Sequence, residues 1–442
     1  MTSSDTCRQL LATIDEHTAH IAVIGLGYVG LPLAITFLRQ GFSVTGFDID
    51  PAKCQAIAAG ETYIRHIPLE PVRSFIESGA LTATTDFARL TEADCIIICV
   101  PTPLSDKMIP DLTALNNTTA TIGRHLRRGQ LVILESTTYP ETTEKEVLPR
   151  LATDTLQVGE DFFLAYSPER EDPGNRQFSV TNIPKIIGGV TPDCLEAADR
   201  LYQKITKTVP VSSARVAEFA KILENTFRSV NIALVNELKM LAHRMGIDIF
   251  EVIQAAATKP FGFTPFYPGP GLGGHCIPID PFYLTWKARE YGFATRFIEL
   301  AGEINTAMPD YVIGKIYEAL NRHGRCVRES TILVLGVAYK KNVDDDRESP
   351  SYPIMQRLRD QGARVIYNDP WIPRLRPTRK YDFAMASVPL DETVLAEADA
   401  VVVLTDHSDY DMDFVVRHAR LIIDTRNATA GLGNTDGKVV VA

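Results

Sequence analysis

The sequence predicts an α/β protein with two Rossmann-like doubly wound parallel-sheet domains joined by a long central helix. Three observations support this. Short apolar runs alternate with helix-length segments in both halves of the chain. A G-x-G-x-x-G spacing follows the first apolar run. From Ala214 to about Gly246, apolar residues recur at helical spacing without interior glycine or proline.

Length and charge limit the possible organisation. A chain of 442 residues favours two or three domains. We expect a first domain over 1–210, a central helical region over 211–310 and a second α/β domain over 311–442. The net charge of −10 argues against a nucleic-acid partner or an anionic membrane surface.

The N-terminal stretch, the short apolar runs and the cysteines indicate a cytoplasmic protein. The stretch "MTSSDTCRQLLATIDEHTAH" lacks the basic-then-apolar pattern of a signal peptide. No apolar run approaches the roughly 18 residues of a membrane-spanning helix. Seven cysteines without regular spacing predict neither a disulfide framework nor a metal site.

Individual strands follow from the apolar runs. In the first domain they are "HIAVI", "SVTGFDI", "ADCIIICVP", "GQLVILEST" and "FFLAYSPE". A second series starts near residue 330 with "STILVLG" and continues through "ARVIYNDP", "ADAVVVLTD" and "HARLIIDTRNA". The second series repeats the architecture of the first but lacks the G-x-G-x-x-G spacing.

The glycine loop "GLGYVG" predicts an NAD site. Gly25 allows the tight turn, Gly27 lets backbone approach a pyrophosphate, and Gly30 lets helix and strand pack closely. Between these glycines, Tyr28 and Val29 complete the cofactor-binding loop. Asp48, at the end of the second strand, would accept hydrogen bonds from the ribose hydroxyls and repel a 2′-phosphate, which favours NAD over NADP.

Polar residues follow several strands, where ligands bind in open α/β sheets. They are Thr102 in "CVPTP", Glu135 and Thr137 in "LESTTYP", Glu169 in "SPEREDPG", and Lys221 and Asn225 in "AEFAKILEN". The last two are four residues apart and share one helix face. Taken singly, the two threonines, Glu169 and Lys221 fit ordinary turn or surface positions better than a functional site, whereas the apolar neighbours of Asn225 favour a satisfied polar contact or a ligand contact.

The stretch "GPGLGGHCIPIDP" holds Cys276 between glycines and prolines, four residues before Asp280. Neither neighbourhood suits a helix or a buried strand. Two interpretations remain open at this point: a structural turn with an incidental cysteine, or a nucleophile presented to a substrate.

Together, several motifs resemble the UDP-glucose/GDP-mannose dehydrogenase family over nearly the whole chain. They are "GLGYVGLPLA", "VPTP", "ESTTYP", "SPER", "AKILEN", "GPGLGGHCIPIDP" and "GVAYKKNVDDDRES". The segment "AAATKPFGF" and the cysteine loop look most like the branch that oxidises UDP-N-acetylglucosamine for polysaccharide synthesis.

The resemblance implies a four-electron oxidation of a sugar C6 alcohol to a carboxylate, with two hydrides passing to NAD. Cys276 would carry the aldehyde as a thiohemiacetal and then a thioester. Lys221 would stabilise oxyanions, and Asp280 and Thr137 would handle protons with a water. Glu169 would activate the hydrolytic water.

The resemblance also implies ligand contacts. Asn225, Tyr267 and Gly273 would contact the sugar nucleotide, and Lys340 its phosphates. Lys259 lies close to where relatives present a basic residue across a dimer interface. The remaining cofactor contacts would come from Thr102, Thr137 and Arg347. A homodimer or higher homo-oligomer is expected.

One departure bears on the sugar. Glucose-type members carry a "PEFLxEG"-like stretch, whereas this chain has "PEREDPG", with Arg170 for phenylalanine and Pro173 for the second glutamate. This difference fits a larger, acylamino-bearing sugar. UDP-glucose, UDP-N-acetylmannosamine, UDP-N-acetylgalactosamine and GDP-mannose remain alternative substrates. An inactive nucleotide-sugar-binding regulator and a two-electron hydroxyacid dehydrogenase remain alternative functions.

Overall fold

The computed structural model describes residues 4–64, 67–105, 107–170, 178, 180–274, 277–378, 380–433 and 437–442. The chain forms two compact units. Unit 1 contains residues up to Glu224 together with Phe282–Ala294, and unit 2 contains Asn225–Pro281 together with Thr295–Ala442. The three sequence ranges expected above are a finer division and stay a prediction.

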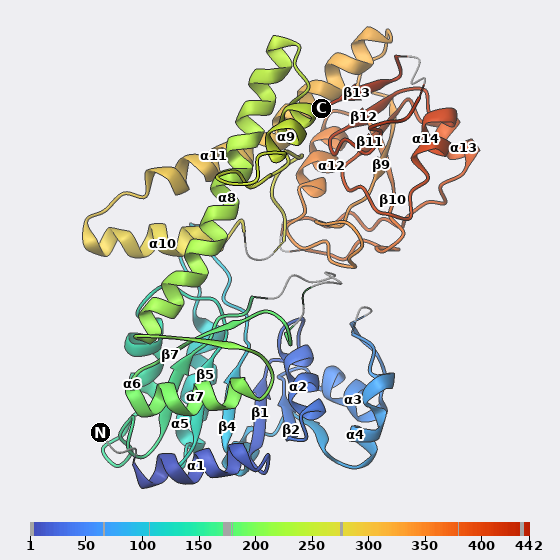
Figure 1. Ribbon diagram of the computed structural model, residues 1–442. Helices are drawn as coiled ribbons and strands as arrows, with labels where there is room; N and C mark the ends of the chain where they lie inside the picture. The colour runs from blue at the N-terminus through green and yellow to red at the C-terminus, as the bar shows by residue number, and fades with distance from the viewer. Residues whose placement is uncertain are drawn as a thin grey trace. The chain divides into compact units, whose positions relative to one another are not determined.

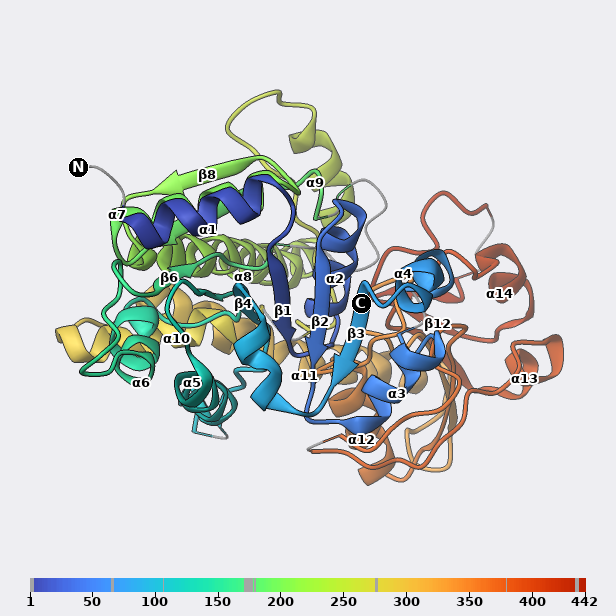
Figure 2. The same cartoon turned by 90° about the horizontal axis from the view of Figure 1, so that it is seen from below.

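Unit 1 is built on an eight-stranded sheet with the order β3-β2-β1-β4-β5-β6-β7-β8. The strands are β1 (His20–Ile24), β2 (Ser43–Phe47), β3 (Leu81–Thr84), β4 (Cys95–Ile98), β5 (Leu131–Leu134), β6 (Phe163–Tyr166), β7 (Lys185–Gly189) and β8 (Thr208–Val211). Figure 2 shows β1, β2 and β3 side by side, as their register requires.

The sheet departs from the all-parallel arrangement expected from the sequence at one place. Strand β7 runs antiparallel to β6, with Ala165 opposite Gly189 and Tyr166 opposite Gly188. No helix lies among the residues that the structure describes between these strands (167–170, 178 and 180–184), and an antiparallel pair needs no crossover helix. Strand β8 then pairs parallel to β7.

The α-helices that lie wholly within unit 1 precede, connect or follow its strands. They are α1 (Asp5–Asp15), α2 (Gly30–Arg39), α3 (Pro51–Ala59), α4 (Arg73–Glu77), α5 (Thr113–His125), α6 (Leu148–Leu151) and α7 (Pro192–Gln203). The 3₁₀ turns are η1 (Glu70–Val72), η2 (Phe87–Glu92) and η4 (Arg289–Tyr291), and η3 (Thr143–Val147) is a π-helical turn.

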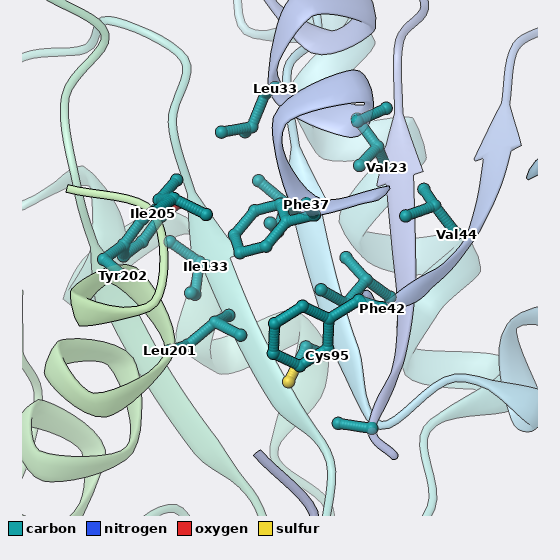
Figure 3. Close-up of a cluster of buried hydrophobic side chains, with 14 of the residues drawn as sticks. Val23, Leu33, Phe37, Phe42, Val44, Cys95, Ile133, Leu201, Tyr202 and Ile205 are labelled. Atoms are coloured by element: carbon teal, nitrogen blue, oxygen red, sulfur yellow. The ribbon is translucent and has the colours of Figure 1, made fainter. Parts of the chain in front are cut away.

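The core of unit 1 lies between the sheet and its covering helices. Side chains of β1, β2, β4 and β5 meet apolar residues of α2 and α7 in the cluster of Figure 3. Phe37 from α2 is fully buried and lies edge-on to Phe42, with ring centroids 5.9 Å apart. Cys95 on β4 belongs to this cluster, which agrees with a structural role for its thiol.

Helix α8 (Ala214–Met245) is the long helix that the sequence predicted. It is 32 residues long, or about 48 Å at 1.5 Å per residue. Its first part belongs to unit 1 and its second part to unit 2 (Figure 1). Residues on either side of the boundary between the two units therefore belong to one continuous helix.

Unit 2 contains a five-stranded parallel sheet with the order β10-β9-β11-β12-β13. The strands are β9 (Thr331–Leu335), β10 (Arg364–Asn368), β11 (Ala400–Val403), β12 (Ile422–Asp424) and β13 (Val439–Val441). The accompanying helices are α9 (Ile249–Ala257), α11 (Arg296–Arg322), α12 (Ser351–Asp360), α13 (Glu392–Glu397) and α14 (Met412–His418); α10 (Asp280–Ala288) begins in unit 2 and ends in unit 1.

Among the residues that the structure describes, none of the helices combines the length and apolar character that a bilayer-spanning segment needs.

Candidate active site

The loop after β1 has the geometry that its glycines predicted. Gly25 has φ +96, and a Cβ there would lie 2.3 Å from the carbonyl oxygen of Cys99 on the neighbouring strand end. A Cβ on Gly30, the first residue of α2, would lie 2.0 Å from the carbonyl oxygen of Gly25. Both positions exclude any larger residue, so the turn and the approach of α2 to β1 depend on glycine.

Gly27 differs from these two positions. A Cβ there would meet nothing within 4 Å, so neighbouring groups do not demand glycine. The open space lies just before the N-terminus of α2, where backbone amides and the helix dipole favour an anion. Tyr28 and Val29 lie beside it and are half-buried. This arrangement fits a pyrophosphate.

Asp48 is buried at the end of β2 and is already engaged. Its Oδ2 accepts hydrogen bonds from Leu26 N and Lys53 Nζ, each at 2.9 Å, and its Oδ1 accepts from Asp50 N at 3.0 Å. Burial opposes ionisation, but these hydrogen bonds lower the pKa of Asp48 below its ordinary value. The carboxylate is therefore ionised and keeps acceptor capacity for a ribose hydroxyl.

Thr102 and Thr137 are brought together at the ends of β4 and β5. The Thr102 hydroxyl donates to the carbonyl oxygen of Thr137 at 2.7 Å, and Tyr283 donates its hydroxyl hydrogen bond to the carbonyl of Thr102. Thr102 and Tyr283 are buried, whereas Thr137 is half-buried. The loops after β4 and β5 therefore lie together at the carboxyl ends of these strands.

Lys221 and Glu169 also meet. Lys221 is buried on α8, and its ammonium donates to the backbone carbonyl of Glu169. Glu169 is half-buried in the turn after β6. An ammonium held at this turn is placed to stabilise negative charge that develops nearby.

One turn further along α8, Asn225 contacts Asp280. Asn225 Nδ2 donates to Asp280 Oδ2 at 2.5 Å, and both side chains are buried. Asp280 is the first residue of α10. The structure therefore joins the central helix to the segment that directly follows the cysteine loop.

Cys276 lies outside the described residues, as does His275. The glycines before it are described, and two of them pack tightly within unit 2. A Cβ on Gly273 or on Gly274 would lie 2.8 Å from atoms of Tyr339. Packing against the segment after β9 therefore requires glycine at both positions.

The other expected residues lie in unit 2. Arg347 is half-buried and pairs with Asp345 at 2.6 Å, while its carbonyl accepts from Gly274 N. Lys340 is half-buried after β9, and Tyr267 is exposed. Lys259 is exposed, with Nζ 5.0 Å from the ring centroid of Phe261.

The glycine loop, the ionised acid at the end of β2 and the strand-end threonines suit a dinucleotide. Family comparison decides the class. The NAD binding domain of the UDP-glucose/GDP-mannose dehydrogenase family matches residues 19–206, its central domain matches 215–307, and its UDP binding domain matches 333–431. The chain belongs to this family. It is an NAD-dependent nucleotide-sugar dehydrogenase, and NAD is its cofactor.

Individual family members are similar over most of their length. The UDP-N-acetyl-D-glucosamine 6-dehydrogenase of Salmonella typhi is 37% identical over 400 residues, which are 90% of this chain and 91% of that protein. The UDP-N-acetyl-D-mannosamine dehydrogenase of Pyrococcus horikoshii is 37% identical over 92% of this chain and 95% of its own.

A solved structure of UDP-D-ManNAc dehydrogenase from Pyrococcus horikoshii matches with a TM-score of 0.83 and 36% identity. The match covers 92% of this chain and 96% of that chain. The family and fold expected from the sequence are therefore confirmed, whereas relatives named for different acetamido sugars are equally similar.

Sequence reasoning missed two polar contacts within unit 1. Lys53, on α3, contacts Asp48, and its spacing five residues after that acid was the available signal. Glu218 on α8 accepts hydrogen bonds from Glu141 N and Thr143 N, a contact that only the fold creates.

Proposed function

We propose that this enzyme oxidises the C6 hydroxyl of UDP-N-acetylglucosamine to a carboxylate in two NAD-dependent steps, through a covalent intermediate on Cys276. The observation that carries the proposal is the pairing of Lys221 with the Glu169 turn and of Asn225 with Asp280, one helical turn apart on α8. Asp280 follows Cys276 by four residues, and Glu169, Lys221 and Asn225 belong to other motifs by which the chain resembles the family.

NAD, when bound at the glycine loop, would accept the hydride of the first oxidation, and a second NAD that replaces the NADH would accept the hydride of the second. Between them, the Cys276 thiolate adds its sulfur to the aldehyde carbon, and the resulting oxyanion takes a proton to form a thiohemiacetal. The second oxidation removes hydride from this carbon and the proton from its oxygen, and leaves a thioester.

Hydrolysis completes the reaction. Water adds its oxygen to the thioester carbon and passes a proton to the Glu169 carboxylate; the carbon–sulfur bond breaks and Cys276 leaves as thiolate. Lys221 stabilises the oxyanion of the tetrahedral intermediate, which suits a buried ammonium. Asp280, Thr137 and an ordered water move the protons of the first oxidation.

The ligand contacts follow the same proposal. Asn225, Tyr267 and Gly273 contact the sugar nucleotide, Lys340 meets its phosphates, and Arg347 approaches NAD. Lys259 is exposed and would act across a subunit interface. The acetamido sugar is supported by "PEREDPG" in place of the glucose-type stretch, and by relatives named for N-acetylglucosamine and N-acetylmannosamine.

The exposed face of α8 supports a homodimer. Apolar side chains recur along it at spacings of three, four or seven residues: Val216, Phe219, Leu223, Phe227, Leu234, Leu238, Leu241 and Met245. A second copy of the chain would bury this stripe. Replacing Leu234 and Leu241 by Asp should halve the mass measured by light scattering; an unchanged mass would contradict the proposed interface.

A nucleotide-sugar panel with NADH counting tests the function. UDP-N-acetylglucosamine should give the highest kcat/KM, with two NADH per uronic acid. The Cys276→Ala enzyme should still bind NAD and sugar nucleotide but lose turnover by orders of magnitude. Higher efficiency with UDP-glucose or GDP-mannose would reject the substrate, and near-normal acid formation by Cys276→Ala would reject the covalent route.

A cytoplasmic location and a role in polysaccharide synthesis accord with this substrate, because activated sugars serve as donors for polymer assembly. Accumulation of the acetamido uronic acid in cells that express the enzyme, and its loss on deletion, would test both.

A further inference from the structure

A buried polar network lies beside the site and has no part in the chemistry described above. Glu135 and Tyr202 are fully buried, and Lys185 is 5% exposed. Lys185 Nζ lies 2.8 Å from Glu135 Oε1 and 2.9 Å from Oε2, and the Tyr202 hydroxyl donates to the same carboxylate. Burying an ion pair costs desolvation that its mutual attraction often only offsets. Stability alone therefore does not account for this buried pair.

The direction of β7 brings this network to the active-site edge. Glu135 directly follows β5, and Lys185 is the first residue of β7. Because β7 runs antiparallel to β6, its first residue lies near the end of β6 rather than at the opposite edge of the sheet. The turn after β6 carries Glu169.

Lys185 contacts that turn directly. Its Nζ lies 3.5 Å from the carbonyl oxygen of Pro168, and the next carbonyl, that of Glu169, accepts from Lys221. Ser167 N donates to Leu134 O at 3.0 Å at the start of the turn. Consecutive residues of the turn are thus held by different elements, and Lys185 supplies the contact just before Glu169.

The far side of the turn is fixed as well. Arg170 donates to the carbonyl of Pro184 and pairs with Glu224 of α8 at 2.7 Å. Its guanidinium therefore links the turn to α8 and to the residue before β7. This contact explains the arginine that replaces phenylalanine here without assigning it a sugar contact.

The charged groups around Lys185 also favour its contact with the turn after β6. The ionisable groups that interact electrostatically with Lys185 are Glu135, Glu169 and Cys99. Burial tends to lower the pKa of Lys185, but the Glu135 and Glu169 carboxylates together raise it above its ordinary value. Lys185 therefore remains an ammonium and can hold the carbonyl of Pro168.

We propose that Lys185, oriented by Glu135 and Tyr202, is a positioning residue that fixes the Glu169 turn for hydrolysis of the thioester. The inference rests on the proposed function, because it gives the network a task only in that step. It assigns no atom transfer to Lys185. The network instead keeps the Glu169 carboxylate where it takes the proton of the attacking water.

The test removes the pair together, because either partner alone would leave a buried charge. The Glu135→Leu/Lys185→Met enzyme should fold and keep the Kd for NAD and for the nucleotide sugar. Its kcat should fall ten-fold or more, and intact-mass spectrometry during turnover should detect the sugar acyl adduct on Cys276. Lys185→Arg, which keeps the charge and the reach, should restore much of the rate and remove the adduct.

Val44→Ala is the matched control, since Val44 is buried in the core of unit 1 on β2 and does not contact the turn. It should lower the melting temperature without adduct accumulation. A normal kcat in the folded double variant would overturn the inference while leaving the proposed function intact. So would a loss of kcat in the double variant without the acyl adduct, if Lys185→Arg does not restore the rate. An unmodified enzyme that oxidises no nucleotide sugar would overturn both.

Discussion

Glu218 provides a sharp test of the energetics, because the fold buries its carboxyl completely. Its Oε2 accepts from Glu141 N at 2.6 Å, and its Oε1 accepts from Thr143 N at 2.8 Å and Thr143 Oγ1 at 2.7 Å. Glu141 has φ +83, a left-handed conformation that this contact helps to hold. Burial raises the pKa of Glu218 from 4.5 to about 7, although the hydrogen bonds oppose the shift.

The sign of the pH dependence follows from this shift. A carboxyl with a raised pKa binds its proton more tightly in the folded state, so it contributes stability below the unfolded pKa. That contribution is lost as the pH rises through the folded pKa. Between about pH 5 and about pH 8, a pKa of about 7 against 4.5 unfolded corresponds to a loss of about 2.5 kcal/mol.

The perturbation is Glu218→Gln, which removes the titration but keeps the shape. The Gln variant should be less stable at about pH 5, because an amide N–H₂ replaces one acceptor of a buried N–H. The stability gap to the unmodified protein should then shrink by about 2.5 kcal/mol on going to about pH 8.

Urea unfolding of both proteins at three pH values measures this gap. Glu237→Gln is the control for the substitution itself, since Glu237 is exposed on the same helix. A Glu218→Gln gap that stays constant, or widens toward alkaline pH, would refute the reasoning.

Three further predictions concern the family's NAD site and its surroundings. Asp48→Ala should narrow the preference for NAD over NADP in steady-state kinetics, because the repelling carboxylate is gone; equal use of both cofactors by the unmodified enzyme would reject this. Gly30→Ala should abolish NAD binding in calorimetry, since its Cβ would lie 2.0 Å from a backbone carbonyl oxygen. Gly27→Ala, which meets nothing, should fold normally and only weaken NAD binding; equal damage by both would contradict the geometry. Tyr283→Phe should lower stability by about 1 kcal/mol in urea unfolding through loss of its hydrogen bond to Thr102, and no change would show that contact to be unimportant.

Local patterns in the sequence determined much of the fold. The apolar runs located β1, β2, β4, β5 and β6, and uninterrupted helical spacing located α8 to within a residue of its ends. The glycine spacing determined the turn before α2, since only glycine satisfies Gly25 and Gly30. These features are readable because each depends on residues close in the chain.

Strands with weak local signals were missed. β7 contains two glycines and β8 a proline, so neither reads as a strand by composition, and both form because the sheet supplies partners. Helix α11 continues past Pro309, which is buried, against the usual rule that an interior proline ends a helix. Tertiary packing decided these elements.

The candidate site divides in the same way. Motifs along the chain picked out Glu169, Lys221, Asn225 and Asp280 as candidate site residues, because the family's motifs are short and keep their local spacing in the sequence. The contact between Lys221 and the Glu169 turn forms only in the folded chain. Folding also brings Lys185 to the carbonyl of Pro168, although Lys185 lies 17 residues later in the sequence. The antiparallel direction of β7 places that ammonium near the carboxyl end of β6, where the Glu169 turn begins, and strand direction is set by the partners in a sheet rather than by the residues of the strand itself.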